Sequence, residues 1–137
     1  MGPCVLDCSV TMSWAFKEEF SPFTQGLLAA LPEGQAIVPP IWPLEVANVM
    51  LMAERGGSMP QADSSRFIGL LEGLPISVEA SLEQRLLDEV LSLARQTGLT
   101  VYDASYLELA GRIGIPLATL DTKLQQAAQR IGVRLLS

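Results

Sequence analysis

In the stretch Val5-Leu6-Asp7-Cys8-Ser9, a short apolar run leads into an acid, Asp7. The stretch Leu117-Ala118-Thr119-Leu120-Asp121 has the same arrangement near the other end of the chain. A short apolar run bounded by polar residues is typical of a buried strand. In open α/β sheets, ligand sites lie outside the carboxyl ends of the strands, near the point where the strand order reverses. Asp7 and Asp121 are therefore predicted to share a site at that edge of a sheet.

Strands alternate with helices throughout the chain, which favours a parallel sheet covered on both faces. We predict a single domain over residues 1–137, of the α/β class, with three layers (α/β/α) and about five strands in the central sheet. The predicted strands lie at 5–8, 36–38, 76–78, 117–120 and 133–136, and the helices at 23–31, 43–56, 61–71, 82–94, 100–111 and 122–130. Within the helix 82–94, the residues expected to face inward are Leu86, Leu87, Val90, Leu91 and Ala94.

The composition limits the classes of protein that this chain can belong to. At 137 residues and 49% hydrophobic content, it is long enough for one core and too apolar for a disordered tail. No apolar stretch is long enough to span a bilayer, and no basic segment precedes an apolar run as in a secretory signal. We therefore expect a cytoplasmic protein without a membrane partner.

The chain contains no histidine, which excludes Ser-His-Asp catalysis and metal sites built on imidazole. Its two cysteines, Cys4 and Cys8, would lie roughly 13 Å apart on one strand, about twice the reach of a disulfide. They are interpreted as small buried hydrophobic residues. Any bound metal is therefore expected to be a hard cation held by oxygen atoms.

Two further acids lie early in predicted helices. Glu45 follows Pro43, which is favoured in a first helical turn, and Asp103 follows Thr100, which opens the next helix. Asp7 and Asp103 lie in runs that otherwise look buried, where a charge needs a partner. The four candidate site residues are thus Asp7, Glu45, Asp103 and Asp121.

Each acid also has a purely structural interpretation. Asp7 and Asp121 could cap the helices that follow them, and Asp103 could form a capping box with Thr100. Glu45 could simply be an acid favoured near the helix dipole. These alternatives remain open from the residues alone.

Three polar side chains lie close to these acids in the sequence. Ser9 and Thr119 are each two residues from an aspartate, and Asn48 follows Glu45 by one helical turn. Their hydroxyl and amide groups could orient carboxylates or bind metal-bound water. Ordinary turn bonding and a solvated asparagine are the alternatives.

Four segments of the chain, each containing one of these acids, follow one another in a characteristic order and spacing. They are 5–9, Pro43-Leu44-Glu45-Val46-Ala47-Asn48, Val101-Tyr102-Asp103-Ala104-Ser105-Tyr106-Leu107, and 118–121. Together they resemble the PIN-domain family, and within it the toxins of VapBC-type toxin–antitoxin pairs. The resemblance implies an endoribonuclease that depends on Mg²⁺ or Mn²⁺, with Asp7, Glu45, Asp103 and Asp121 as metal ligands. It also implies RNA as the substrate, a homodimer and a cognate antitoxin.

Lys123 occupies a position where some members of the family carry a further acid, and it could instead contact a phosphate of the substrate. The net charge of −6 is unusual for a protein that binds nucleic acid. Two divalent ions would cancel the charge of four carboxylates.

The same residues leave other functions open. Asp7-Cys8-Ser9-Val10-Thr11 approximates the Asp-x-Ser-x-Ser motif of metal-dependent von Willebrand A-like binding modules, which would leave Glu45 and Asp103 without roles. A catalytically inactive PIN-like scaffold is the second alternative. Receiver and haloacid dehalogenase domains fit less well, because Cys8 and Ser9 replace the acids that they need.

Overall fold

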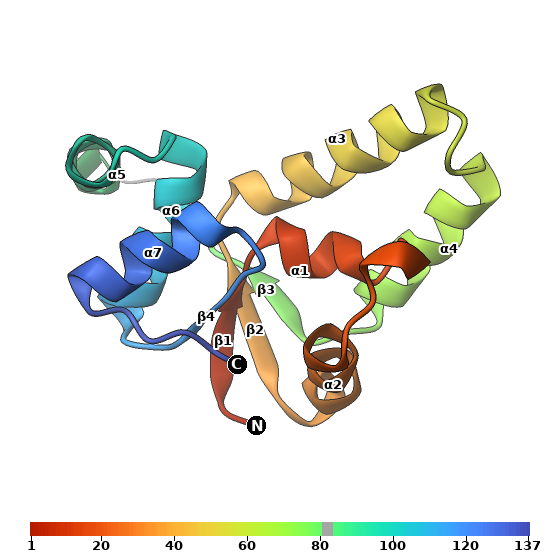
Figure 1. The fold of residues 1–137 in the computed structure, drawn as a ribbon, viewed down its shortest axis with the longest axis horizontal. Helices are drawn as coiled ribbons and strands as arrows, with labels where there is room; N and C mark the ends of the chain where they lie inside the picture. The colour runs from red at the N-terminus through yellow and green to blue at the C-terminus, as the bar shows by residue number, and fades with distance from the viewer. Residues whose placement is uncertain (81–83) are drawn as a thin grey trace.

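The computed structural model describes residues 1–80 and 84–137, in which four parallel strands form one sheet (Figure 1). The strand order is β3-β2-β1-β4, and every neighbouring pair is parallel. The strands are β1 (Pro3–Leu6), β2 (Gln35–Val38), β3 (Ile76–Val78) and β4 (Leu117–Ala118). The predicted α/β class is therefore confirmed.

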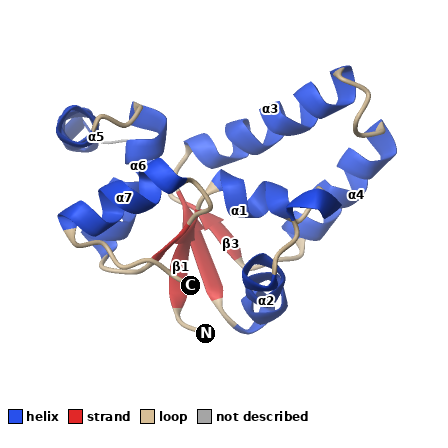
Figure 2. Cartoon of the chain, viewed as in Figure 1, coloured by secondary structure: helices blue, strands red, loops and turns tan. Residues whose placement is uncertain are grey.

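Helices cover the sheet on both sides, as the prediction of three layers requires (Figure 2). In Figure 1, α1 to α4 lie to the right of the sheet and α5 to α7 to its left, while α3 and α4 extend away from it at the upper right. The helices are α1 (Cys8–Ser13), α2 (Pro22–Ala30), α3 (Ile41–Arg55), α4 (Gln61–Glu72), α5 (Gln84–Thr97), α6 (Val101–Ile113) and α7 (Thr122–Ile131), with short 3₁₀ turns η1 (Lys17–Glu19) and η2 (Leu31–Glu33). Within the described residues, no helix has both the length and the apolar composition needed to cross a membrane.

The prediction of about five strands is wrong, because the described sheet has four. The run 133–136 forms only an isolated bridge, between Leu135 and Leu117. Helix α7 does not end until Gly132, which adopts the left-handed conformation at φ 83°. The few residues that remain after this turn cross the edge of β4 at one point and do not form a strand.

The strand order reverses between β1 and β4. The chain steps from β1 to β2 to β3 in one direction, and then returns to place β4 on the free edge of β1. Val5 pairs with Leu117 and Leu6 with Ala118, and the backbone N–H of Asp7 donates to the Ala118 carbonyl at 3.0 Å. Asp7 and the residues after β4 therefore meet at the position where ligands bind in sheets of this kind.

Helix α1 is an element that the sequence pattern did not predict. The run 5–8 was expected to be a strand, but β1 ends at Leu6 and Cys8 already begins the helix. Nearly every residue of α1 is buried, so its sequence lacks the alternation of polar and apolar faces that identifies a surface helix. Cys4 and Cys8 are both buried and free, as predicted.

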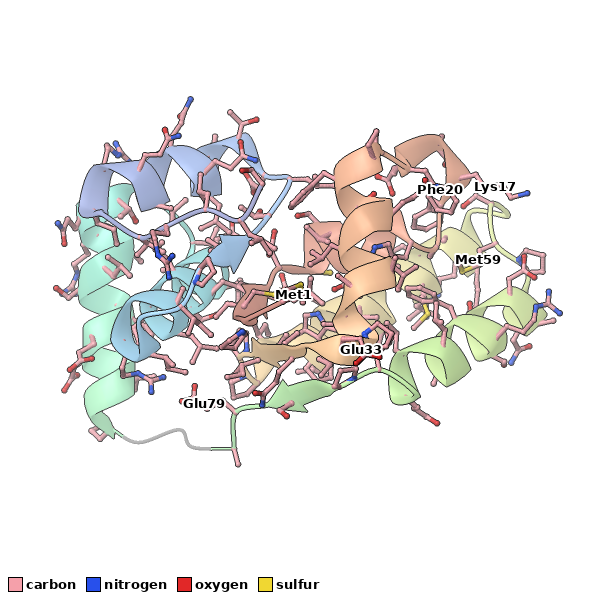
Figure 3. The ribbon with its side chains drawn as sticks, turned by 90° about the horizontal axis from the view of Figure 1, so that it is seen from below. Met1, Lys17, Phe20, Glu33, Met59 and Glu79 are labelled. Atoms are coloured by element: carbon pink, nitrogen blue, oxygen red, sulfur yellow. The ribbon has the colours of Figure 1, made fainter. Side chains whose placement is uncertain are left out.

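Helix α5 was predicted to bury one apolar face, and this prediction is only partly right. Ala94 is buried, but Leu87 is 63% exposed and Leu91 is also exposed. The helix packs on α6 and lies at the opposite end of the molecule from α4 (Figure 3). The predicted start of this helix at residue 82 and the side chain of Leu86 lie outside what the structure describes.

Candidate functional site

Asp7 lies between the end of β1 and the start of α1, and the residue is only 5% exposed. Its Oδ2 atom accepts hydrogen bonds from Ser9 Oγ and from Thr119 Oγ1, both at 2.7 Å. Although Asp7 occupies the N-cap position of α1, its side chain makes no capping hydrogen bond. The interpretation of Asp7 as a helix cap is therefore wrong.

The two hydroxyls that contact Asp7 also determine where β4 ends. The backbone N–H of Leu120 donates to Ser9 Oγ at 2.9 Å, and that of Asp121 donates to Thr119 Oγ1 at 3.0 Å. The predicted strand 117–120 is shortened to Leu117–Ala118, since these side chains take the place of ladder partners. Ser9 and Thr119 thus join the loops after β1 and β4.

Asp121 is the N-cap of α7. Its Oδ1 atom accepts from the backbone N–H groups of Lys123 at 2.9 Å and Leu124 at 3.4 Å. The capping interpretation is confirmed for this residue. Both bonds end on one oxygen, so capping leaves the other carboxylate oxygen for a further role.

Glu45 is half-buried in the second turn of α3, and its Oε1 atom accepts a hydrogen bond of 2.5 Å from the Tyr106 hydroxyl on α6. Tyr106 was not among the predicted site residues. An apolar-looking position in the interior of a helix gave no signal, because only the tertiary structure brings its hydroxyl to an acid 61 residues away in the chain.

Asp103 is half-buried in the first turn of α6. Its backbone N–H donates to the Thr100 hydroxyl at 3.1 Å, which is the first half of the predicted capping box. The Thr100 hydroxyl also acts on the carboxyl group of Asp103: burial and the charges of Asp7 and Asp121 raise the pKa of that group, and the hydroxyl lowers it.

The four carboxylates interact electrostatically. Burial is the main cause that raises the pKa of Asp7, Glu45 and Asp103 above their ordinary values. The neighbouring charges add to this: Asp121 raises the pKa of Asp7 and of Asp103, and Asp7 raises that of Glu45 and of Asp103. Hydrogen bonds from hydroxyl groups act in the opposite direction. Among the described residues, no lysine or arginine contributes to these shifts.

The chemistry of this donor set fits a hard divalent cation, because carboxylate oxygens are its preferred protein ligands and positive charge is what the cluster lacks. Over residues 1–80 and 84–137, however, no group of three acidic or cysteine side chains is placed so that together they could hold a metal ion. Mg²⁺ commonly keeps several of its waters and binds through one or two carboxylates, so a complete cage is not required.

Asn48 and Lys123, the two remaining predicted residues, are both exposed. Asn48 lies one turn after Glu45 on α3, and Lys123 lies in the first turn of α7, two residues after the cap. Neither side chain is part of the hydrogen-bond network around Asp7.

An open groove of about 310 Å³ lies beside Asp121 and Ser9. Glu19, from η1, lines the same groove, and burial followed by the charge of Glu18 raises the pKa of Glu19. Sequence reasoning did not single out this acid, which is brought near the site only by the path of the chain after α1. Of the four candidate acids, Asp121 lines this groove, which gives solvent and ligands access to it.

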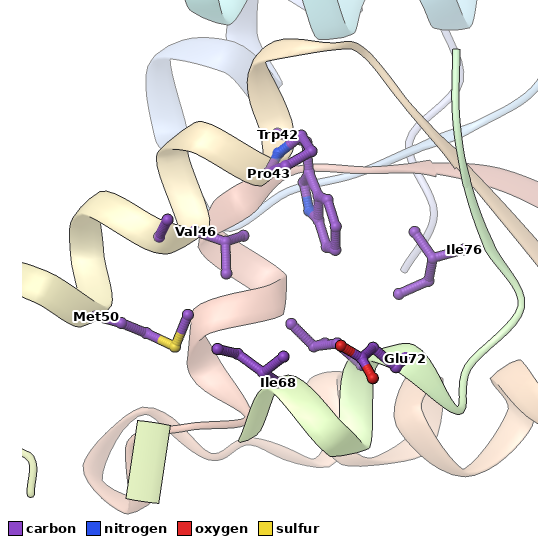
Figure 4. A pocket seen from close by; sticks show the side chains of 9 residues that line it. Trp42, Pro43, Val46, Met50, Ile68, Glu72 and Ile76 are labelled. Atoms are coloured by element: carbon purple, nitrogen blue, oxygen red, sulfur yellow. The ribbon is translucent and has the colours of Figure 1, made fainter. Parts of the chain in front are cut away.

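A second groove, of about 340 Å³, lies between α3 and α4 and is almost wholly apolar (Figure 4). Trp42, Val46, Met50 and Ile68 contribute to its lining, and Glu72 is its acidic member. It lacks the convergent oxygen donors found around Asp7, so we assign it no part in the chemistry.

Comparison with known proteins places this arrangement in a family, since a model described as the PIN domain matches residues 4–130. The chain belongs to the PIN domain family. The resemblance inferred from the sequence is thereby confirmed.

Two relatives of this PIN domain come from Pyrobaculum aerophilum. Ribonuclease VapC3 is 33% identical over 82 residues, which cover 60% of this chain and 63% of that protein. Exonuclease VapC9 is 38% identical over 80 residues, covering 58% and 57%. The matched segments thus span less than two thirds of either relative.

Two solved structures share the fold. The crystal structure of PAE2754 from Pyrobaculum aerophilum has a TM-score of 0.70 and 26% identity, covering 93% of this chain and 87% of that one. A chain of a toxin–antitoxin complex from Klebsiella pneumoniae has a TM-score of 0.59 and 18% identity, covering 88% of both chains. The latter likeness shows a common architecture.

Proposed function

We propose that this PIN domain is a metal-dependent endoribonuclease and the toxin of a type II toxin–antitoxin pair. Asp7, Glu45, Asp103 and Asp121 would hold Mg²⁺ or Mn²⁺ through oxygen or water. The observation that carries the proposal is a set of carboxylates around the switch point of the sheet, three of which, Asp7, Glu45 and Asp103, have raised pKa values that no described basic residue offsets. The names of the two relatives, a ribonuclease and an exonuclease, support nuclease chemistry.

Each acid has a distinct setting from which to act. Ser9 and Thr119 hold Oδ2 of Asp7, which fixes the orientation of the carboxylate at the carboxyl end of β1. The amides of α7 hold Oδ1 of Asp121 in the same way. When bound, a divalent ion supplies an activated water and offsets charge on the phosphodiester. Asn48 and Lys123, being exposed beside the acids, are proposed to contact phosphate oxygens of the RNA.

Exposed apolar side chains support the proposal of protein partners, namely a second copy of the chain and an antitoxin. Leu87 and Leu91 are exposed one turn apart on α5, and Leu44 is exposed beside Glu45. Large apolar side chains that gather on a surface are typical of interaction sites. Light scattering measures the oligomeric state, and co-expression with the adjacent reading frame tests for an inhibitory partner.

Cleavage of RNA with Mg²⁺, Mn²⁺ or chelator tests the nuclease proposal. An endonuclease should cut both linear and circular RNA of one sequence. An exonuclease, which starts from a chain end, would leave the circular RNA intact. Asp7→Asn should lower the rate by about a thousandfold, the effect of losing several kcal/mol of metal-assisted stabilisation. The matched control is Asp88→Asn, which removes the same charge from the exposed surface of α5.

Cleavage that survives both the chelator and Asp7→Asn would contradict the proposal. Absence of cleavage on all RNA substrates, with the metal bound, would favour the inactive scaffold. Metal-dependent binding of a protein ligand without cleavage would favour the von Willebrand A-like alternative.

A further inference from the structure

The hydrogen bond between Tyr106 and Glu45 joins two elements that are far apart in the chain. Tyr106 is completely buried in α6, and its hydroxyl donates to Oε1 of Glu45 on α3 at 2.5 Å. A buried tyrosine hydroxyl needs a hydrogen-bond acceptor, and any backbone carbonyl oxygen within reach would be sufficient. Here the partner is one of the four acids proposed to bind metal.

The backbone around Glu45 is fixed separately from its side chain. Trp42, one turn earlier in α3, donates from Nε1 to Thr11 Oγ1 at 3.0 Å, and that hydroxyl lies 3.3 Å from the carbonyl oxygen of Asp7. The start of α3 is thus tied to the loop that carries Asp7. What these bonds leave free is the rotamer of the Glu45 side chain.

Without a further contact, repulsion and hydration would favour rotation of the Glu45 side chain away from the other acids and into solvent. Asp7 and Asp103 carry like charge near Glu45, and Glu45 is only half-buried, so water is within its reach. A glutamate gains rotamer freedom and hydration when it extends into solvent. The bond from Tyr106 opposes this movement while it occupies only Oε1, which leaves the second carboxylate oxygen for a ligand.

We propose that Tyr106 is a positioning residue, whose hydroxyl holds Glu45 in the orientation that binds the divalent cation. This inference rests on the proposed function. Groups that orient metal ligands in this way typically contribute tenfold to a hundredfold to metal affinity or activity.

Binding of Mn²⁺ alone, followed by the loss of the free-ion signal in electron paramagnetic resonance, tests the proposal without any nuclease assay. Tyr106→Phe should weaken Mn²⁺ binding about tenfold or more. Tyr102→Phe is the matched control, because Tyr102 lies on the same helix, is 56% exposed, and should bind Mn²⁺ as the parent does. In a Glu45→Gln background, Tyr106→Phe should have a much smaller effect, since the pair acts as a unit.

Two replacements at position 106 separate positioning from packing. 4-Aminophenylalanine keeps a donor and should restore Mn²⁺ binding, whereas 4-methylphenylalanine fills the same volume without a donor and should not. This pair decides the question if Tyr106→Phe does not fold. Native Mn²⁺ affinity in Tyr106→Phe or in the 4-methyl variant overturns the proposal. A parent protein that binds no Mn²⁺ would instead refute the proposed metal-dependent function itself.

Discussion

Two groups of acids in this molecule are stabilised by different means. Glu79, which follows β3 (Figure 3), and Glu108 on α6 both accept hydrogen bonds from Arg112, at 2.7 and 2.5 Å. At the other group, around Asp7, the partners are hydroxyl groups and backbone amides. Helix α6 contributes an acid to both groups, Asp103 to one and Glu108 to the other. The groups therefore differ in the partners of their acids and not in the kind of element that carries them.

The comparison teaches how a structural ion pair differs from a site prepared for a ligand. The two glutamates raise the pKa of Arg112, which is what opposite charges in contact do. At Asp7 and Asp103, burial raises the pKa and the charges of neighbouring acids add to it, which costs free energy that the rest of the fold must supply. Stability given up at one place in this way is characteristic of functional sites.

The largest expected difference between the two groups is their response to Mg²⁺. At a concentration 100 times its dissociation constant, a bound ion raises the free energy of unfolding by about 2.7 kcal/mol. We expect this gain in the parent and in Arg112→Gln, because the ion pair is not the binding site. Asp7→Asn should lose most of it. Thermal melts with chelator and with Mg²⁺ measure the gain, and an equal gain in all three proteins would remove the distinction.

A second difference should appear as a dependence on pH in the presence of chelator. Asp7 has a raised pKa in the folded state, chiefly through burial, so the folded protein binds its proton more readily than the unfolded chain does. The stability that this proton contributes is present below the unfolded value, 3.8, and is lost as the pH rises through the folded pKa. The parent should therefore lose stability relative to Asp7→Asn as the pH rises from about 4. Urea denaturation of both proteins across this range measures the difference, and parallel curves would show that Asp7 is not destabilised by its setting.

The smallest effect is expected at Asp121, which shares features of both groups. Asp121→Asn keeps a cap for α7, because asparagine caps about as well as aspartate, and it removes one of the repelling charges. In chelator, the free energy of unfolding of Asp121→Asn should exceed that of the parent by roughly a few tenths of a kcal/mol, so it should melt slightly higher. Added Mg²⁺ should stabilise the variant less than it stabilises the parent. Asp121→Ala, which removes the cap as well, should lose about 1 kcal/mol. Identical Mg²⁺ shifts in parent and Asp121→Asn would leave Asp121 as a cap only.

The accuracy of the sequence predictions varied with the kind of evidence that each element left in the chain. Helix α4 was predicted at 61–71 and is found at Gln61–Glu72, because its boundaries coincide with residues that start and stop helices. Helix α1 was missed because burial on all sides erases the periodic pattern. The strand at 133–136 was predicted from its apolar residues alone, and these do not show whether a neighbouring strand is available for pairing. In the structure this segment makes only one isolated bridge.

By itself, the sequence determined the alternation of strands and helices, the absence of imidazole chemistry and the identity of the acids to consider. These properties follow from residue types and their spacing, which are local. Only the tertiary structure decided that β4 lies beside β1, that Asp121 caps a helix while Asp7 does not, and that the hydroxyl of Tyr106 meets Glu45. The cap at Asp121 uses amides two and three residues away, so the sequence could offer it as a possibility. The Tyr106–Glu45 and Thr119–Asp7 bonds instead join residues 61 and 112 positions apart, and their side chains carry no local mark of their partners.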